Sequence, residues 1–462
     1  MNILEQRFSQ LLARRQANGS LRTPKLSDNL VDFSSNDYLS FAQNITLQNR
    51  VKLAYDAYIS QSNPAAATGS RLLTGHNFLY QQLENQLVRF YNAEAALVVN
   101  SGYEANLGLL LACCRKTDLI LADELAHASL CDAARWTGAE THFFRHNDIE
   151  HLEILLYNKF YYGKIEGQNQ NVNVEKIDKE IKVKTEIEIK DEIKNGVKII
   201  DKNQTIKKNN QNSSLTENRE PHNHTPKTEN REPHNHTAPP ENREPQAAIF
   251  VLIESVYSMD GDIAKLLEII ELCEKYGAFL LVDEAHATGI FGSGLVAELN
   301  LQHRVWARMH TFGKALAAHG AIILGSNLLK QYLLNFARPF IYTTALPPHS
   351  LIQISESHHF LDENPLFLTQ IKAKIALFQQ IMLPLRPLIQ LSHSAIQWFS
   401  CSSNARANEL SFFLRQNGFD IRPILSPTVA AGSERLRICL HLHNTEADFL
   451  KLKNLLQSWI NS

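Results

Sequence analysis

Short apolar runs alternate with helical patterns along most of this 462-residue chain. Helical periodicity is clear at Leu266–Tyr276, which Gly277 follows in the position that commonly ends a helix. Buried strands separated by such helices predict an α/β fold with a mostly parallel sheet covered on both faces. The apolar runs that predict these strands lie at Ala95–Val99, Ala247–Ile253, Ala278–Val282 and Ala321–Leu324.

The pattern changes from about Pro365 onwards. Helical segments such as Ala407–Gln416 are followed there by shorter strands such as Arg435–Leu440, which predicts a smaller C-terminal α+β domain. We therefore divide the chain into an N-terminal segment (1–45), a large domain in two parts (46–157 and 247–361), an insertion (158–246) and a small C-terminal domain (362–462).

Residues 158–246 interrupt the large domain with a sequence rich in Asn, Lys, Glu, Thr and Pro. The motif "TENREPHNHT" occurs at Thr216 and again at Thr228. Such a composition buries too little apolar surface to offset the entropy of ordering, so we expect a disordered surface insertion. Residues 181–190 alternate like a strand but have no apolar neighbours to pair with. The insertion also contains two histidine pairs that could bind a metal, although closed sites usually take ligands from ordered elements: His222, His224, His234 and His236.

Charge and cysteine content narrow the class of protein. Lysine and arginine number 46 against 48 acidic residues, so a net charge of -2 gives no electrostatic case for nucleic acid or an anionic membrane. Six cysteines without a CxxC pair favour a reducing compartment. The first fifteen residues read as an amphipathic helix rather than a signal peptide, and no apolar run is long enough to span a bilayer. We expect a cytoplasmic protein.

The candidate chemistry begins with Lys314, in the stretch "HTFGKALAAHGA". Its small neighbours leave the amine uncrowded, as bonding to a carbonyl partner requires, although a surface lysine at the start of a helix is the alternative. Asp283 follows a buried strand and His286 comes three residues later, at the strand end where parallel sheets bind ligands. An N-cap role for Asp283 remains open. The "DEAH" letters do not indicate a helicase, because no GxxxxGK[ST] loop occurs.

Two further segments add polar groups. A strand runs into Ser101-Gly102-Tyr103 and a helical pattern follows, so backbone N–H groups there form an anion site suited to phosphate. His127 lies in a polar loop before another helix, where a structural role is the alternative. A phosphate turn, an aromatic ring, a carboxylate and an amine are together the parts that pyridoxal phosphate requires.

These motifs make the chain similar to a known family, the α-oxoamine synthases among the fold-type I pyridoxal-phosphate enzymes. The resemblance covers nearly the whole chain outside the insertion. It implies a fold-type I transferase with pyridoxal 5'-phosphate as cofactor and no metal. The matching stretches are "DFSSNDYLS" (32–40), "GSRLLTGHN" (69–77), "NSGYEAN" (100–106), "DELAHASL" (123–130), "HNDIEHLE" (146–153), "ESVYSMDGDIA" (254–264), "VDEAHATGIFG" (282–292), "TFGKALAAHGA" (311–321) and "FARPFIYTTALPP" (336–348).

The resemblance implies roles for individual residues. Lys314 would bond the cofactor's aldehyde and remove the substrate's α-proton, Asp283 would pair with the pyridine nitrogen, and His286 with the ring's phenolic oxygen. His127 would stack on the ring and act in catalysis. Cofactor contacts are further implied for Gly102, Tyr103, Ser258, Thr311 and, from the second subunit of a homodimer with shared sites, Thr344; substrate contacts are implied for Arg22, Asn36, His127, Thr428 and Arg437.

The resemblance also implies a reaction, the decarboxylative condensation of L-alanine with pimeloyl-CoA or with pimeloyl bound to acyl carrier protein, in biotin biosynthesis. Within the family, glycine C-acetyltransferase and 5-aminolevulinate synthase are the alternatives. A non-catalytic scaffold subunit is a third hypothesis, against which the presence of both Lys314 and Asp283 argues.

Overall fold

The computed structural model describes residues 2–24, 29–166 and 247–461, with residues 160–166 described by their backbone only. Compact packing divides the chain into two units, one formed by residues 1–158 with 247–462 and the other by residues 159–246. The repeats, the histidine pairs and the alternating stretch of the predicted insertion lie outside the described residues. The first unit contains every candidate site residue.

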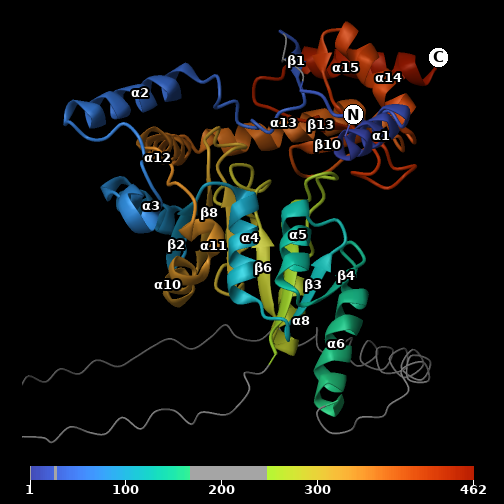
Figure 1. Cartoon of the computed structure of the whole chain (residues 1–462). Coiled ribbons are helices and arrows are strands. Elements are labelled where there is room, and N and C mark those ends of the chain that lie inside the picture. The colour runs from blue at the N-terminus through green and yellow to red at the C-terminus, as the bar shows by residue number, and fades with distance from the viewer. Residues whose placement is uncertain (1, 25–28, 167–246, 462) are drawn as a thin grey trace, which may run out of the picture. The chain divides into compact units, whose positions relative to one another are not determined.

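A seven-stranded sheet forms the centre of the first unit, in the order β2-β8-β7-β6-β5-β3-β4 (Figure 1). Neighbours run parallel from β7 to β4, whereas β8 is antiparallel to both β2 and β7. The predicted mostly parallel sheet is therefore confirmed. The strands are β2 (Ala95–Val99), β3 (Leu119–Asp123), β4 (Glu140–Phe144), β5 (Ile249–Glu254), β6 (Phe279–Asp283), β7 (Ala307–Thr311) and β8 (Ala321–Gly325).

Continuous apolar runs explain why the central strands are covered on both faces. Every residue of β2, β3 and β5 is buried. Three adjacent strands nevertheless end in an acidic residue: Asp123 on β3, Glu254 on β5 and Asp283 on β6. Because parallel strands end at the same edge of a sheet, these three carboxyl groups gather at one edge, where such folds bind ligands.

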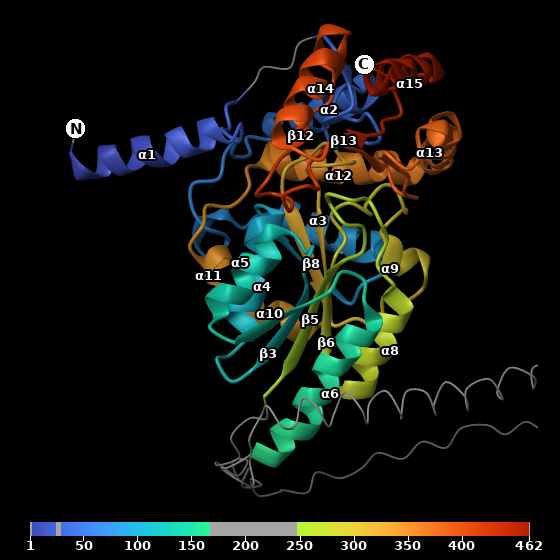
Figure 2. The same ribbon diagram turned by 90° about the vertical axis from the view of Figure 1, so that its right-hand side faces the viewer.

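Helices cover both faces of the sheet, with α4 and α5 on one side and α8 and α9 on the other (Figure 2). On the first face α4 contacts β7 and β8, and α5 contacts β3; on the second, α8 contacts β6. The helices of this part of the chain are α2 (Ile45–Ser60), α3 (Phe78–Phe90), α4 (Gly102–Cys113), α5 (Ala128–Thr137), α6 (Ile149–Glu166), α8 (Leu266–Tyr276), α9 (Leu295–Glu298), α10 (Asn327–Phe336), α11 (Arg338–Ile341) and α12 (Pro348–Glu363).

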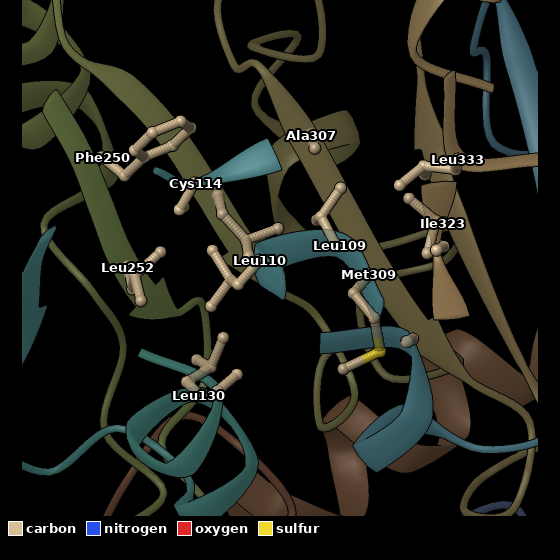
Figure 3. Packing of buried hydrophobic residues seen from close by; sticks show 14 of the residues in the cluster. Leu109, Leu110, Cys114, Leu130, Phe250, Leu252, Ala307, Met309, Ile323 and Leu333 are labelled. Atoms are coloured by element: carbon tan, nitrogen blue, oxygen red, sulfur yellow. The ribbon is translucent and has the colours of Figure 1, made fainter. Parts of the chain in front are cut away.

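A buried apolar cluster joins the sheet to α4 and α5 (Figure 3). Leu109 and Leu110 of α4 and Leu130 of α5 are fully buried in it, together with Leu252 and Met309 from the strands. Each such side chain contributes about 1.5–3 kcal/mol when it is removed from water. This layer therefore fixes the N-terminal ends of α4 and α5 relative to the strand ends.

Helix α8 begins and ends where the sequence pattern predicts. Gly277 follows it with φ +66°, a left-handed conformation that a residue without a Cβ adopts at little steric cost. Its N–H bonds the carbonyl groups of Cys273 and Glu274, which satisfies acceptors that the helix end leaves open.

The C-terminal part of the first unit contains a second, smaller sheet in the order β12-β13-β10-β9, with antiparallel pairing throughout. These strands and helices lie where the sequence analysis expects a small α+β domain, and they belong to the same compact unit as the seven-stranded sheet. Its elements are α13 (Leu366–Met382), β9 (Ile389–Gln390), β10 (Ile396–Ser400), α14 (Asn404–Gln416), β12 (Pro423–Ile424), β13 (Arg435–Cys439) and α15 (Glu446–Ile460).

The N-terminal segment is joined to this C-terminal part. Strand β1 (Val31–Asp32) pairs in parallel with β11 (Phe419–Asp420). Asn404 and Asn408 of α14 donate hydrogen bonds to the backbone carbonyls of Asn18 and Gly19. Segments at opposite ends of the sequence thus lie side by side, an arrangement that the sequence pattern did not predict.

Helix α1 (Ile3–Ala17) is present as predicted, with an Asn2 capping box at its start. Its apolar stripe, however, is not buried, since no residue of α1 is buried and Phe8 is 57% exposed. Within the described residues, no helix combines the length and the apolar character needed to cross a bilayer.

Helix α6 extends past Asn158, the residue where the sequence analysis begins the insertion. Leu152 and Leu156 are fully buried on it. Burial of these side chains stabilises the helix up to this point, and helical backbone continues to Glu166.

Candidate active site

Lys314 lies in a tight loop between β7 and β8. Two backbone bonds close the loop: Ala317 N–H donates to the carbonyl of Lys314 and Ala318 N–H to that of Phe312, each over 2.9 Å. Ala317 adopts φ +48°, which a small side chain tolerates more readily than a bulky or β-branched one. The run of small residues therefore serves the loop geometry that holds Lys314 at the end of β7.

The Lys314 amine is surrounded by charged groups and partly buried. Burial lowers the pKa of Lys314 to about 8, and Asp283 and Glu254 offset part of this effect by favouring the charged amine. Arg437 acts in the same direction as burial. A fraction of the amine is therefore neutral near pH 7, which an amine needs if it is to act as a base or nucleophile.

Asp283 is 3% exposed at the end of β6. Its Oδ2 accepts a hydrogen bond from Asn106 Nδ2 over 2.9 Å, and its Oδ1 accepts from the backbone N–H of Ala285 over 3.0 Å. These donors compensate for part of the cost of burying the carboxylate and fix its orientation.

Glu254 lies beside Asp283, since the two residues pair in register across β5 and β6. Its Oε2 accepts from Ser258 N–H over 3.1 Å, while Oε1 has no partner among the described residues. Burial, followed by the charge of Asp283, raises the pKa of Glu254 well above its usual range. The buried position beside Asp283 therefore disfavours the charged form of Glu254.

His286 is buried and bonded to Tyr38 from the N-terminal segment. Tyr38 OH lies 2.7 Å from His286 Nδ1 and 3.1 Å from Asn36 Oδ1. Burial lowers the pKa of His286 well below its usual range, and the charges of Lys314 and Arg437 add to this effect. The imidazole is therefore neutral, with Nδ1 engaged and Nε2 available.

Arg437 of β13 connects the small sheet to this site. Its Nε donates to the carbonyl of Ser258 over 2.7 Å and its Nη2 to Asn36 Oδ1 over 3.1 Å. Arg437 is 9% exposed. A guanidinium held in this way presents fixed N–H groups, which suit a carboxylate.

The predicted phosphate turn begins α4. Ser101 caps the helix, with its Oγ accepting from Glu104 N–H over 3.2 Å. A Cβ on Gly102 would lie only 2.5 Å from Cγ2 of Thr311, so this close approach requires glycine. Thr311 Oγ1 is buried and has no hydrogen-bond partner among the described residues. Tyr103 is exposed, and its hydroxyl donates to Asp132 over 3.0 Å.

His127 precedes α5 and caps it, because its Nδ1 accepts from the backbone N–H of Ser129 over 3.2 Å. Its side chain is exposed, in contrast to the buried Asp283. The pKa of His127 is lowered, first by partial burial and then by the charge of Lys314, while Asp283 acts in the opposite direction.

Two predicted substrate residues, Arg22 and Thr428, contact each other. Arg22 Nη2 donates to Thr428 Oγ1 over 3.1 Å, although the residues are far apart in sequence. Thr344 lies elsewhere: its carbonyl accepts from Asn100 Nδ2 over 2.8 Å, and its side chain is exposed. No described hydrogen bond links Thr344 to Lys314 or Asp283.

Four polar residues of this arrangement are absent from the sequence-based candidates: Tyr38, Asn106, Ser129 and Glu254. All four lie inside the stretches that carry the family resemblance. Asn106 offered a signal of its own, since it is a polar residue within the apolar helix "ANLGLLLA". The others needed the fold, because nothing local in the sequence shows that they are buried next to Asp283 or His286.

The fold and this arrangement of side chains define a fold-type I pyridoxal-phosphate-dependent enzyme. The family described as aminotransferase class I and II matches residues 28–162 and 237–450. The chain belongs to this family.

Curated relatives give more detail. 8-Amino-7-oxononanoate synthase of Emericella nidulans is 32% identical to this chain and the match covers 94% of the chain and 90% of the relative. The protein of the same name from Haemophilus ducreyi is 30% identical, with 91% and 89% covered.

Solved structures share the fold. Serine palmitoyltransferase of Sphingomonas wittichii has a TM-score of 0.73 at 22% identity, and the match covers 99% of this chain and 98% of that one. 8-Amino-7-oxononanoate synthase from Francisella tularensis has a TM-score of 0.64 at 20% identity, with 94% and 99% covered. At these identities the likeness supports the fold alone.

Pyridoxal 5'-phosphate is the cofactor of this enzyme class, and the residues present fit it. No described hydrogen bond uses the backbone N–H groups of Gly102 and Tyr103, which begin α4, so both can face a phosphate. The unpartnered hydroxyl of Thr311 is a donor for the same anion. The buried carboxylate of Asp283 retains accepting capacity for a protonated ring nitrogen.

Proposed function

We propose that this chain condenses L-alanine with a pimeloyl thioester, releasing 8-amino-7-oxononanoate, CO2 and a free thiol for biotin biosynthesis. The observation that carries the proposal is the position of Lys314, in the loop that follows β7, within electrostatic reach of the buried carboxylate of Asp283 at the end of the neighbouring strand β6. The names of two relatives at 30% identity or more support the choice of substrates.

Holding the cofactor falls to residues around the strand ends. Besides Lys314, we propose contacts from Gly102, Tyr103, Ser258 and Thr311, with the α4 N-terminus and the Thr311 hydroxyl facing the phosphate. Thr344 would contact the phosphate bound by a second copy of the chain, so the active form would be a homodimer with shared sites.

When bound, the cofactor supplies an electron-withdrawing ring that accepts the electron pair left on the substrate's α-carbon. Asp283 would hold a proton at the ring nitrogen, because its carboxylate is already oriented by Asn106 and Ala285. His286 uses Nδ1 for Tyr38, which leaves Nε2 for the ring's phenolic oxygen.

Proton transfer falls to Lys314. A pKa of about 8 leaves part of the amine neutral, so it can take the α-proton of alanine and return a proton to the same carbon after CO2 leaves. Arg437 would bind the alanine carboxylate, since it is fixed by Asn36 and Ser258 and cannot lose its charge. The new carbon–carbon bond joins the α-carbon to the thioester carbonyl, and the thiol departs.

The remaining substrate contacts are proposed for Arg22, Asn36, His127 and Thr428. The hydrogen bond between Arg22 and Thr428 brings a cation and a hydroxyl to one place, which suits the acyl substrate's polar groups. The thioester donor is either coenzyme A or acyl carrier protein, and a cytoplasmic location stays a prediction.

The test is a screen of amino acids against acyl thioesters with purified protein loaded with cofactor, read by product mass. We expect 8-amino-7-oxononanoate from L-alanine with pimeloyl-CoA or pimeloyl-carrier protein. Product from glycine with acetyl-CoA or succinyl-CoA alone would instead indicate one of the two related synthases. Turnover with none of these pairs would favour the scaffold hypothesis.

A further inference from the structure

A chain of hydrogen bonds, buried from Ser129 onward, joins the imidazole of His127 to the carboxylate of Asp283. His127 Nδ1 lies 2.8 Å from Ser129 Oγ, which lies 2.9 Å from Asn106 Nδ2. The same Nδ2 lies 2.9 Å from Asp283 Oδ2. Asn106, Ser129 and Asp283 are each at most 3% exposed, so bulk water does not compete for the two bonds that join these three residues.

Chemistry sets the direction of every bond in this chain. A carboxylate only accepts, so Asn106 turns its amide nitrogen toward Asp283 and uses its second hydrogen for Ser129 Oγ. The Ser129 hydroxyl accepts there, and its own hydrogen is free to be donated to His127 Nδ1 once that nitrogen is shown to be an acceptor.

A backbone amide fixes the other end. The N–H of Ser129 donates to His127 Nδ1 over 3.2 Å, and a backbone N–H has no acceptor capacity. Two donors from one residue therefore point at Nδ1, and this nitrogen carries a lone pair instead of a hydrogen. In a neutral imidazole the hydrogen is then on Nε2.

We propose that Asn106 and Ser129 are positioning residues that hold His127 as a neutral imidazole protonated at Nε2. This inference rests on the proposed function only for the statement that His127 faces the reacting groups. The tautomer follows from the chain's own hydrogen bonds.

The surrounding charges are compatible with a neutral His127. Asp283, Lys314 and Asp132 act on it, and His286 lies near enough to feel its charge. Burial has the largest effect and lowers the pKa of His127; Asp283 and Asp132 raise this pKa, whereas Lys314 lowers it further. A second proton would have to bind Nδ1, where both donors of Ser129 already point, so the protonated ring loses these bonds.

The locked tautomer has a consequence for the site. His127 presents one N–H group, at Nε2, to an oxygen of a substrate and no acceptor nitrogen beside Lys314. It therefore orients a substrate without competing with Lys314 for the α-proton. The link through Asn106 also ties this orientation to the position of the Asp283 carboxylate.

The experiment measures the protonation state of His127 directly. Cofactor-loaded protein is labelled with 15N-histidine, and the His127 signals are assigned by their loss in His127→Gln. We expect one nitrogen of the unprotonated type and one of the protonated type through neutral pH. In Ser129→Ala the lost hydroxyl donor should raise the titration midpoint of His127 by about 0.7 pH unit, because one hydrogen bond contributes about 1 kcal/mol.

Ser357→Ala is the matched control, since Ser357 is also fully buried but its hydroxyl has no partner among the described residues. It should leave the His127 titration unchanged. Should Ser129→Ala fail to fold, Ser129→Cys keeps the side-chain size with a weaker donor and should give a shift in the same direction.

Three results would overturn the inference: a proton on Nδ1 in the unaltered protein, a His127 titration indifferent to Ser129, or an equal shift in Ser357→Ala. None of these readings needs turnover. If His127 is a neutral imidazole protonated at Nε2 but the protein makes no 8-amino-7-oxononanoate, the proposed function is wrong and this inference still holds.

Discussion

Two buried aspartates at the same edge of the same sheet lie in different polar surroundings. Asp123, at the end of β3, accepts from His146 Nδ1, the N–H groups of Leu125 and Asn147, and Tyr257 OH, all within 3.0 Å. The described hydrogen bonds of Asp283, at the end of β6, come from Asn106 and Ala285. The Asp123 carboxylate is saturated by four donors of the fold, whereas the Asp283 carboxylate can accept further hydrogen bonds.

The basic residues near the two aspartates also differ, because the pKa of one is raised and that of the other is lowered. Burial by itself lowers the pKa of His146, but hydrogen bonds to Asp123 and Asp262 outweigh it and raise the pKa to about 10. Burial lowers the pKa of Lys314 to about 8. A closed ion pair keeps its charge and holds the loop after β4 to the loop after β5. A lysine with a lowered pKa, near a carboxylate that can accept further hydrogen bonds, is instead suited to acid–base or nucleophilic catalysis.

Lys314→Ala should give the largest effect. It removes the amine proposed to bond the cofactor and move the α-proton, so activity should fall by about 10⁴-fold. The visible absorbance of the covalently attached cofactor should disappear as well. Lys372→Ala, which removes an exposed lysine paired with Glu298, should change neither reading. Turnover retained in Lys314→Ala would exclude the assignment.

Asp283→Asn should follow, with a loss of about 10²–10³-fold in kcat while some cofactor is retained. The amide is nearly isosteric but cannot stabilise a protonated ring nitrogen, so the ring accepts electrons poorly. Steady-state kinetics with a thermal melt separates this effect from unfolding. Full activity in this variant would contradict the role that we propose for Asp283.

Asp123→Asn tests the other half of the comparison. It leaves His146 with a weaker partner in a buried network, so the free energy of unfolding should fall by about 3 kcal/mol. Activity per folded molecule should remain near that of the unaltered chain. Urea denaturation combined with active-site titration checks both. A loss of activity at unchanged stability would erase the distinction between the two aspartates.

The pH dependence of stability should show the smallest effect. The pKa of His146 is raised from 6.5 to about 10, so its stabilising contribution is complete below about pH 6.5 and disappears as pH rises toward 10. After solvent screening we expect a difference on the order of 1–2 kcal/mol. Urea denaturation of the unaltered chain and of His146→Gln, from pH 6 to pH 10, should show the two curves converging. Parallel curves would contradict this ion pair.

Much of the fold could be predicted from local pattern. Strand β2 and helix α8 have the predicted bounds, because a continuous apolar run and an amphipathic segment ended by glycine are local signals. The pairing of β1 with β11 was not predictable in this way, since it joins residues from opposite ends of the sequence. Periodicity likewise predicted helix α1 but not the exposure of its apolar stripe.

Some residues of the candidate site could be predicted from the sequence, and others could not. Lys314, Asp283, His286 and Arg437 could be selected by residue type, position after a strand, and family resemblance, and the fold brings them to one edge. Asn106 and Ser129 could not be selected for their present roles, because a hydrogen bond across elements depends on both partners' positions.

The order of apolar and polar residues alone indicated several strands and helices, such as β2, β6 and α8, and the acid that follows the apolar run of β6, because those are properties of neighbours in the chain. It did not distinguish Asp123 from Asp283, since both follow a buried strand. Only the tertiary structure decided that one carboxylate is saturated by four donors and the other keeps free capacity. The reason is that electrostatic environment is a sum over groups near in space, whatever their separation in sequence.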